Sequence, residues 1–233
     1  MIRALVFDFD GLILDTEEPI YRSWLEVYQA HGEHLPFDRW IETVGSNNAM
    51  FDPRSFLEHR LGRPLTQEVI DRRVERRTQL VLEQPVLPGV AELVGAAREA
   101  GLSVAVASSS SCQWVTGHLE RLGLRDHFAC ICGRDDVTAV KPAPELYLAA
   151  LACLEVRPDE AVAIEDSPNG VAAAKAAGMW CVAVPNVITG ALDLSRADVV
   201  LESLSGVTPP DLAEKLGLTL LTGDANRDPD RRR

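Results

Sequence analysis

Residues 4–11 of this chain read ALVFDFDG, a short apolar run followed by two acids and a glycine. The run Ala4–Phe7 does not alternate with polar residues, which is typical of a parallel strand with both faces covered. Asp8 and Asp10 follow this predicted strand directly, and ligands of open α/β sheets bind beyond the carboxyl ends of the strands. The segment therefore predicts a parallel sheet with acidic side chains at its ligand-binding edge.

Four later apolar runs resemble the first in length and in their content of valine, isoleucine and alanine. They cover residues 102–107, 128–132, 161–164 and 181–184. Amphipathic stretches with helical spacing lie between most of these runs. They cover residues 89–100, 112–122, 144–154 and 168–177. Strands that alternate with helices predict βαβ units, and hence an α/β fold with a doubly wound, mostly parallel, Rossmann-like sheet.

One long interval, residues 16–84, breaks this alternation because it contains no convincing strand. Its first part carries an apolar stripe at helical spacing, which includes Ile20, Trp24 and Tyr28. Pro53 opens a short predicted helix, and a longer one follows it. The interval therefore predicts a separate helical domain.

The expected organisation has three parts. Residues 1–15 and 85–222 form the α/β core, and residues 16–84 form a helical domain inserted after the first strand. Residues 223–233 are polar and are expected to be a disordered tail.

The longer helix of the insertion carries a basic cluster, which consists of Arg72, Arg73, Arg76 and Arg77. Such a cluster can bind an anion. Glu75 lies among the arginines, however, and alternating charges are typical of a solvated helix face. We favour the solvated face.

Composition excludes several classes of partner. The 233 residues include 23 Lys+Arg against 35 Asp+Glu, so the formal net charge is −12. An acidic chain lacks the basic face that binds nucleic-acid phosphates or anionic membranes. We also expect neither a signal peptide nor a membrane-spanning segment, because no apolar run is long enough. The odd number of cysteines, five, predicts reduced thiols and a cytoplasmic location.

Polar residues follow each of the first four predicted strands. They are Asp8 and Asp10, the serines 108–111, Lys141, and the group Glu165, Asp166 and Ser167. Each pattern alone has a structural explanation as a turn, a helix cap or a surface charge. Together, at one sheet edge, carboxylates, hydroxyls and an ammonium are typical of a site for a hard cation and a phosphoryl group.

The residue types suit phosphoryl transfer in two steps. A carboxylate such as Asp8 can attack phosphorus and form an aspartyl-phosphate, and Asp10 can carry the proton. Ser108 and Lys141 can hold the phosphoryl oxygens, where charge is spread in the transition state. Mg²⁺ prefers oxygen ligands of the kind that Asp8, Asp166 and the carbonyl of Asp10 offer.

The sequence resembles the haloacid dehalogenase superfamily, in the phosphatase branch with a helical cap and closest to its β-phosphoglucomutase-like members. Four motifs carry the resemblance: DFDGLILDTE (8–17), AVAS (105–108), VKPAP (140–144) and IEDSPNG (164–170). The resemblance implies that Asp8 is the nucleophile and Asp10 the general acid and base. It also implies a phosphate site of Ser108, Ser109 and Lys141, and a Mg²⁺ site of Asp8, Asp10, Glu165 and Asp166.

Departures from the family pattern separate its activities. The presence of Asp10 disfavours a dehalogenase, and the absence of lysine from residues 16–84 disfavours a phosphonoacetaldehyde hydrolase. Ile20 stands where the mutases have a histidine, and the loop 45–48 lacks their arginine. We therefore expect a Mg²⁺-dependent phosphatase of small phosphorylated metabolites, with a sugar phosphomutase as the alternative. A binding module that kept the fold without activity would require a broken motif, and none is broken.

The leaving group is expected to contact the cap. The candidate residues are Thr16, Ser46, Asn47 and Asn48. These side chains offer hydrogen bonds without charge, which suits a sugar or nucleoside, although turn chemistry explains the loop equally well. The oligomeric state cannot be predicted from the sequence.

Overall fold

The computed structural model describes residues 1–41 and 51–220, and within these residues six strands form one parallel sheet in the order β3-β2-β1-β4-β5-β6. The strands are β1 (Ala4–Phe7), β2 (Ser103–Ala107), β3 (Cys130–Cys132), β4 (Ala161–Glu165), β5 (Trp180–Ala183) and β6 (Val199–Val200). The order reverses on the two sides of β1, so the carboxyl ends of β1, β2 and β4 are neighbours. The predicted doubly wound α/β fold is confirmed, although β6 was not predicted.

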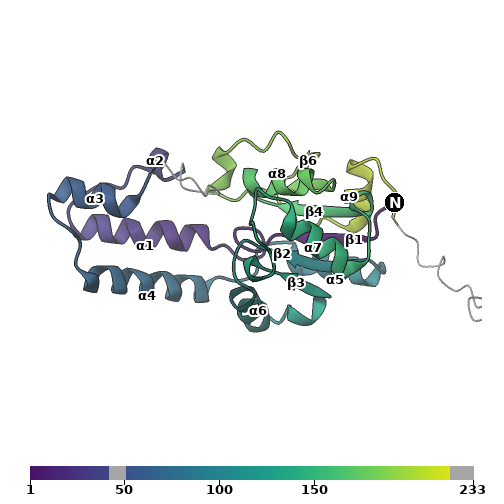
Figure 1. Ribbon diagram of the computed structural model, residues 1–233, viewed down its shortest axis with the longest axis horizontal. Helices are drawn as coiled ribbons and strands as arrows, with labels where there is room; N and C mark the ends of the chain where they lie inside the picture. Colours follow the sequence, from purple (N-terminus) through teal and green to yellow (C-terminus); the bar gives the residue numbers. More distant parts are fainter. Residues whose placement is uncertain (42–50, 221–233) are drawn as a thin grey trace, which may run out of the picture.

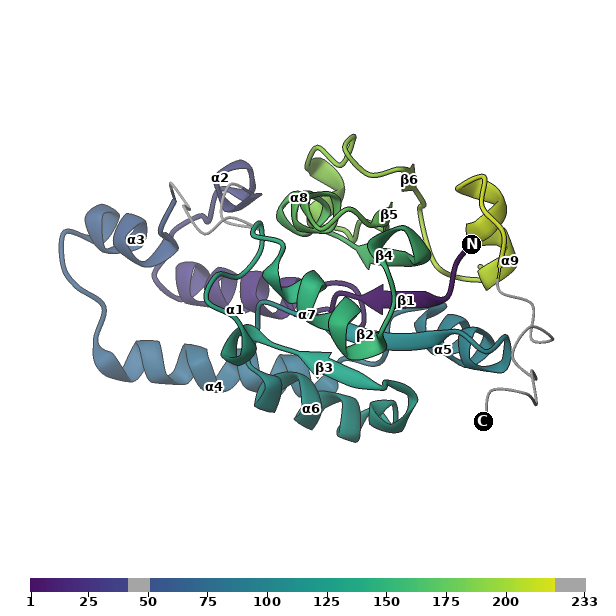
Figure 2. The same ribbon diagram turned by 45° about the vertical axis from the view of Figure 1, so that its right-hand side comes forward.

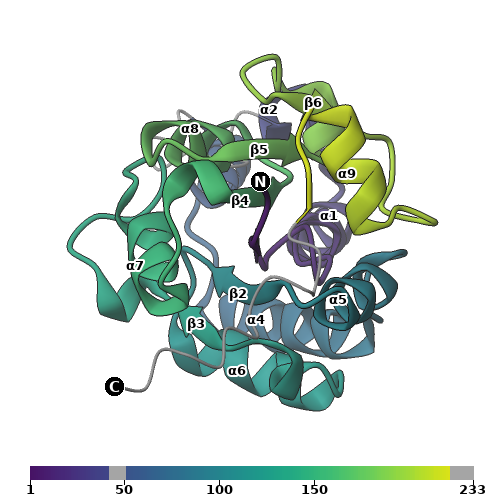
Figure 3. The same cartoon turned by 90° about the vertical axis from the view of Figure 1, so that its right-hand side faces the viewer.

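Helices cover both faces of this sheet (Figure 3). The helices that follow the insertion are α5 (Val90–Glu99), α6 (Cys112–Arg121), α7 (Glu145–Leu154), α8 (Pro168–Ala176) and α9 (Pro209–Lys215). Buried residues of α5, α6 and α9 pack in one hydrophobic cluster with the sheet, and those of α7 and α8 pack in another. Of these helices, only α9 was not predicted.

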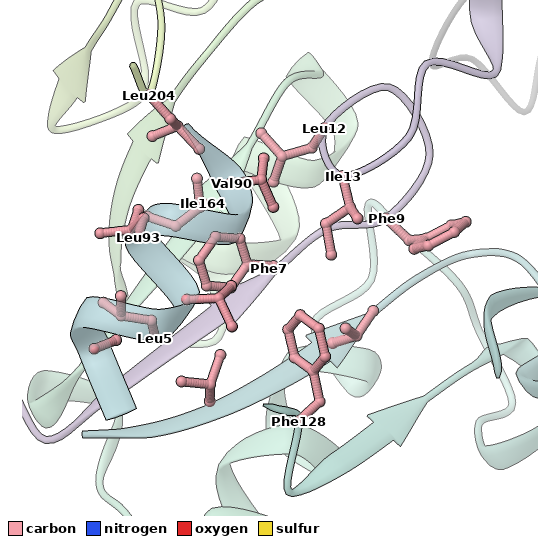
Figure 4. Packing of buried hydrophobic residues seen from close by; sticks show 14 of the residues in the cluster. Leu5, Phe7, Phe9, Leu12, Ile13, Val90, Leu93, Phe128, Ile164 and Leu204 are labelled. Carbon is pink, nitrogen blue, oxygen red and sulfur yellow. The ribbon is translucent and has the colours of Figure 1, made fainter. Parts of the chain in front are cut away.

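The two faces of the sheet differ in side-chain size, because successive residues of a strand point to opposite faces. Leu5 and Phe7 of β1 lie beside Val90 and Leu93 of α5 (Figure 4). The α7–α8 face is mostly alanine. Its buried strand residues are Ala4, Val6, Ala105, Ala107, Cys132, Ala161, Ala163, Cys181 and Ala183. The small side chains let α7 and α8 pack close to the strands.

The helices of the insertion lie beyond one end of the sheet (Figures 1 and 2). They are α1 (Glu17–Ala30), α2 (Phe37–Ile41), α3 (Pro53–Leu61) and α4 (Gln67–Glu83). Trp24 and Tyr28, from the apolar stripe of α1, are buried there in a hydrophobic cluster of their own. Ile188, from the loop after β5, also belongs to this cluster, so the insertion packs against the rest of the molecule at that loop.

The cysteines correct one prediction. Cys130 of β3 and Cys153 of α7 form a disulfide, whereas Cys112, Cys132 and Cys181 are free. The prediction of reduced thiols is therefore wrong for one pair. Its physical reason is the packing of α7 against the edge strand β3, which places the two Cα atoms 6.7 Å apart, within the usual range for a disulfide.

Two predictions concern residues outside the described ones. Ser46, Asn47 and Asn48 fall in the gap 42–50, and the predicted tail 223–233 lies past residue 220. Within residues 1–41 and 51–220, the structure contains no helix with the length and apolar character needed to cross a membrane.

Candidate active site

The centre of the site is a buried lysine between two carboxylates. Asp8 directly follows β1, and Glu165 is the last residue of the neighbouring strand β4. The Nζ atom of Lys141 donates to Oδ1 of Asp8, and to Oε1 of Glu165 at 2.6 Å. All three side chains are buried. The structure thus brings together residues that are more than 20 positions apart in the chain, as expected from their places after three of the predicted strands.

Glu165 is held on both carboxylate oxygens by the protein itself. Besides Lys141, the hydroxyl of Tyr147 donates to Oε1 at 2.6 Å. The backbone N–H of Asp166 donates to Oε2 at 3.1 Å. Gly170 of α8 lies against this carboxylate, and a Cβ at Gly170 would come within 1.9 Å of it. Glu165 is therefore fixed in place, and Gly170 provides the space for it.

Asp166 joins Asp8 and Glu165 in an acidic cluster. One oxygen from each of the three carboxylates lies within 4.8 Å of the others, and all three are buried. The Nδ2 group of Asn186 donates to Oδ2 of Asp166 at 2.9 Å and to the carbonyl of Gly11 at 3.1 Å. Asn186 thereby connects the loop after β5 to the loop after β1.

The charges of this cluster do not balance. Burial raises the pKa of Asp8 to about 8, although the ammonium of Lys141 opposes this rise. Burial, followed by the charges of Asp8 and Glu165, raises the pKa of Asp166 well above its usual value. Burial would lower the pKa of Lys141, but Asp8 and Glu165 outweigh it and raise that pKa. One ammonium could not neutralise three ionised carboxylates, so Asp8 and Asp166 tend to hold protons, and a divalent cation would let them ionise.

Asp10 lies outside this cluster and has its own set of donors. Its Oδ2 accepts from the hydroxyl of Ser110 at 2.7 Å and from that of Ser108 at 3.2 Å. Its Oδ1 accepts from the indole N–H of Trp114 at 3.1 Å. The backbone N–H of Ser110 in turn donates to Oγ of Ser108 at 2.9 Å. Three side chains therefore fix the orientation of the Asp10 carboxylate.

A cavity of about 440 Å³ opens beside Asp10. It lies between α1 and α4 on one side and the segment that follows β2 on the other. Its lining is formed by Asp10, Thr16, Glu17, Ile20, Arg77, Val81, Ser109, Ser110, Ser111, Trp114 and Arg134. Three predicted site residues, Asp10, Thr16 and Ser109, therefore line the cavity, whereas Lys141 and Asp166 lie in the buried cluster beside Asp8.

Comparison with known families agrees with this arrangement. A family model described as haloacid dehalogenase-like hydrolase matches residues 2–178, more than half of the chain. The chain belongs to the haloacid dehalogenase-like hydrolases. The match includes all the predicted core site residues, from Asp8 to Asp166.

Two relatives of this haloacid dehalogenase-like hydrolase are similar over nearly their whole length. YhcW of Bacillus subtilis (strain 168) is 46% identical over 206 residues, which are 88% of this chain and 93% of that protein. Hexitol phosphatase B of Escherichia coli (strain K12) is 36% identical over 216 residues, which are 91% of this chain and 96% of that protein.

Solved structures share the fold of this hydrolase. The crystal structure of CbbY from Rhodobacter sphaeroides in complex with phosphate has a TM-score of 0.68 and 30% identity, and the match covers 91% of this chain and 99% of that one. The crystal structure of β-phosphoglucomutase from Clostridium difficile has a TM-score of 0.67 and 24% identity, with coverage of 93% and 98%. The second likeness shows the fold alone.

Several residues of the hydrolase's site were not predicted. They are Ser110, Trp114, Tyr147 and Asn186. Ser110 belongs to the serine run 108–111, and Asn186 lies two residues past the apolar run 181–184, outside the four motifs that carry the resemblance. Trp114 and Tyr147 lie within amphipathic helices, where an aromatic residue normally indicates only a core position. Their polar atoms gave no signal in the sequence.

Proposed function

We propose that this hydrolase is a Mg²⁺-dependent phosphatase that acts on small phosphorylated metabolites, such as sugar phosphates or nucleoside monophosphates. The observation that carries the proposal is the buried arrangement of Asp8, Lys141, Glu165 and Asp166, with Asp10 turned toward a cavity. The name of the relative hexitol phosphatase B supports the same class of substrate.

The first step transfers the phosphoryl group to Asp8. An oxygen of Asp8 attacks phosphorus, the bond from phosphorus to the leaving oxygen breaks, and Asp10 donates a proton to that oxygen. Lys141 stabilises the charge on the phosphoryl oxygens, and Ser108 lies beside Asp10, at the end of β2, to donate to them. Ser109 lines the cavity, and in this proposal its backbone N–H donates to the same group.

The second step returns Asp8 to its free form. Asp10 takes a proton from water, the water oxygen attacks phosphorus, and the bond between phosphorus and Asp8 breaks to release phosphate. Asp10 thus ends each cycle with the proton it began with. The donors from Ser110 and Trp114 orient its carboxylate between the two steps.

Mg²⁺ is the cofactor of this proposal. Asp8, Asp166 and the backbone carbonyl of Asp10 would hold it, and Glu165, whose carboxylate lies in the same cluster, would add negative charge. When bound, Mg²⁺ supplies positive charge that offsets the carboxylates and polarises the phosphoryl group.

Residues 16–84 act as a cap over a core of residues 1–15 and 85–222, and Thr16 contacts the leaving group in the cavity between them. The contacts expected of Ser46, Asn47 and Asn48, and the cytoplasmic location, stay predictions from the sequence.

The test is phosphate release from p-nitrophenyl phosphate. We expect turnover with Mg²⁺ and its loss with EDTA. Asp8→Asn should remove turnover and keep a cooperative thermal transition. Asp126→Asn changes an exposed aspartate in the segment before β3, at the opposite end of the strands from the site, and should keep wild-type kcat. Full activity of Asp8→Asn would overturn the assignment of the nucleophile.

A sugar phosphomutase is the alternative. Ile20, which stands where the mutases have a histidine, lines the cavity and offers no proton there, and this favours the phosphatase. Incubation of β-glucose 1-phosphate with a bisphosphate activator separates the two. Glucose and phosphate support the phosphatase, and glucose 6-phosphate supports the mutase.

A further inference from the structure

Three of the four arginines in the basic cluster of α4 have partners within the insertion. Arg72 pairs with Glu68 one turn earlier on the same helix. Arg76 donates to Glu26 of α1 at 3.0 Å. Arg73 donates to Ser23 of α1 at 3.0 Å, and its guanidinium lies 4.7 Å from the centre of the Trp24 ring.

Arg77 differs from these three. It lines the cavity beside Asp10. Among the described residues it makes no hydrogen bond or ion pair, and its Nε atom is buried without any partner. The pKa of Arg73 is lowered to about 10, first by burial and then by the charge of Arg77. A buried guanidinium donor without an acceptor is costly, so the position favours an acceptor that arrives with a ligand.

A second cation, Arg134, lines the same cavity from the segment after β3. Its ion pair with Asp135 spans 4.0 Å and lies at the surface, so it competes weakly with a ligand. The cavity also contains Glu17, whose pKa is raised to about 7, mainly by burial and then by the charges of Asp10 and Asp15. Glu17 therefore carries only part of a negative charge near neutral pH.

We propose that Arg77 binds an anionic group on the leaving part of the substrate, with Arg134 as the second cation in the lining of the cavity. The substrate is then a phosphate monoester that carries a second anion, either a carboxylate or another phosphate. The guanidinium of Arg77 offers paired N–H donors for such a group. This inference rests on the proposed phosphatase function, and it narrows the substrate class.

The test compares substrates that differ only in the second anion. For the carboxylate, the pair is 3-phosphoglycerate and glycerol 3-phosphate. For the phosphate, the pair is fructose 1,6-bisphosphate and fructose 1-phosphate. We expect a higher kcat/KM for the substrate with the second anion in at least one pair, and the pair that shows it identifies the anion. Equal values, or a preference for the substrate without the second anion in both pairs, would overturn the inference.

Variants assign the preference to Arg77. In Arg77→Gln, the ratio of kcat/KM between the substrate with the second anion and the one without it should fall roughly tenfold or more. Arg77→Lys should retain part of the ratio, because it keeps the charge but not the planar donors. Arg72→Gln, at an exposed position of the same helix, is the matched control and should keep the wild-type ratio. An unchanged ratio in Arg77→Gln contradicts the proposal.

A binding measurement separates this inference from the proposed function. Failure to hydrolyse any ester, p-nitrophenyl phosphate included, would contradict the phosphatase assignment. Calorimetric titration of Asp8→Asn with the substrates of both pairs measures binding without turnover. Tighter binding of a substrate with the second anion, lost when Arg77→Gln is added, supports the anion site. Equal binding within both pairs refutes it even if the enzyme hydrolyses other esters.

Discussion

At the scale of single residues, the indole of Trp114 provides one of three donors to the Asp10 carboxylate. Trp114→Phe removes this donor and keeps an aromatic ring against His118. We expect kcat for p-nitrophenyl phosphate to fall by up to about tenfold, because one hydrogen bond to a charged group contributes roughly 1.5 kcal/mol. The free energy of unfolding should fall by about 0.5–1.5 kcal/mol, because the folded protein loses the same hydrogen bond.

Trp180→Phe is the matched control for this variant. The indole of Trp180 donates to the carbonyl of Asp159 at 3.3 Å, at the start of β5 and away from Asp10. Its kcat should equal that of the wild type. If both variants have the same kcat, the contact between Trp114 and Asp10 has no role in turnover.

Glu17 gives a second prediction at this scale, through the pH dependence of stability. Its pKa is about 7 in the folded protein against 4.5 normally, mainly because of burial. The folded state therefore binds more protons than the unfolded state between these values, and stability falls as pH rises through them. Glu17→Gln should remove this fall, on the order of 2 kcal/mol between about pH 5 and pH 8.

Urea denaturation at the two pH values measures this difference. Glu18→Gln changes the neighbouring residue in the first turn of the same helix and should keep the wild-type pH dependence. A fall of equal size in the wild type and in Glu17→Gln would show that other groups cause it.

At the scale of elements, α8 illustrates how one helix position depends on the site. Gly170→Ala places a Cβ within 1.9 Å of the Glu165 carboxylate. We expect a loss of about 1–3 kcal/mol in the free energy of unfolding and a marked loss of activity, because Glu165 must move. In Gly95→Ala on α5, the added Cβ meets no atom within 4 Å, and stability should rise by about 0.5–1 kcal/mol. Thermal denaturation of both variants tests the contrast.

The same elements show what a sequence can predict. The run Ala4–Phe7 is a strand as expected, because a buried parallel strand has a distinctive continuous apolar pattern. Val199–Val200 was missed because two residues at a sheet edge leave no pattern. The residues at strand ends, such as Asp8 and Glu165, were found because topology alone brings them together. Tyr147 was missed because its ring packs as core and only its hydroxyl reaches the site.

At the scale of the whole molecule, the loop after β5 contacts both the acidic cluster of the site and the insertion. Asn186 donates to Asp166, and Ile188 is 4% exposed within the hydrophobic cluster of the insertion. Ile188→Ala should lower the free energy of unfolding by about 2–4 kcal/mol through the cavity it leaves. It should also lower kcat/KM, because the loop that holds Asn186 loses its anchor.

Val187→Ala in the same loop is the control, because Val187 is 91% exposed. Its stability and its kcat/KM should both match the wild type. Loss of stability without loss of kcat/KM in Ile188→Ala would show that the loop anchors the insertion without affecting Asp166.

The difference in side-chain size between the two faces of the sheet determines which buried positions tolerate substitution. Ala105 and Ala163 on one face are as inaccessible as Leu5 and Phe7 on the other, each 0% exposed. A library of random substitutions should nevertheless recover many variants at Leu5 and Phe7, where another large apolar side chain can repack. At Ala105 and Ala163 almost every substitution adds volume against α7 or α8. Substitutions that accumulate during evolution should therefore be found mostly on the α5 face of the sheet. The exposed fractions alone do not distinguish this face from the other.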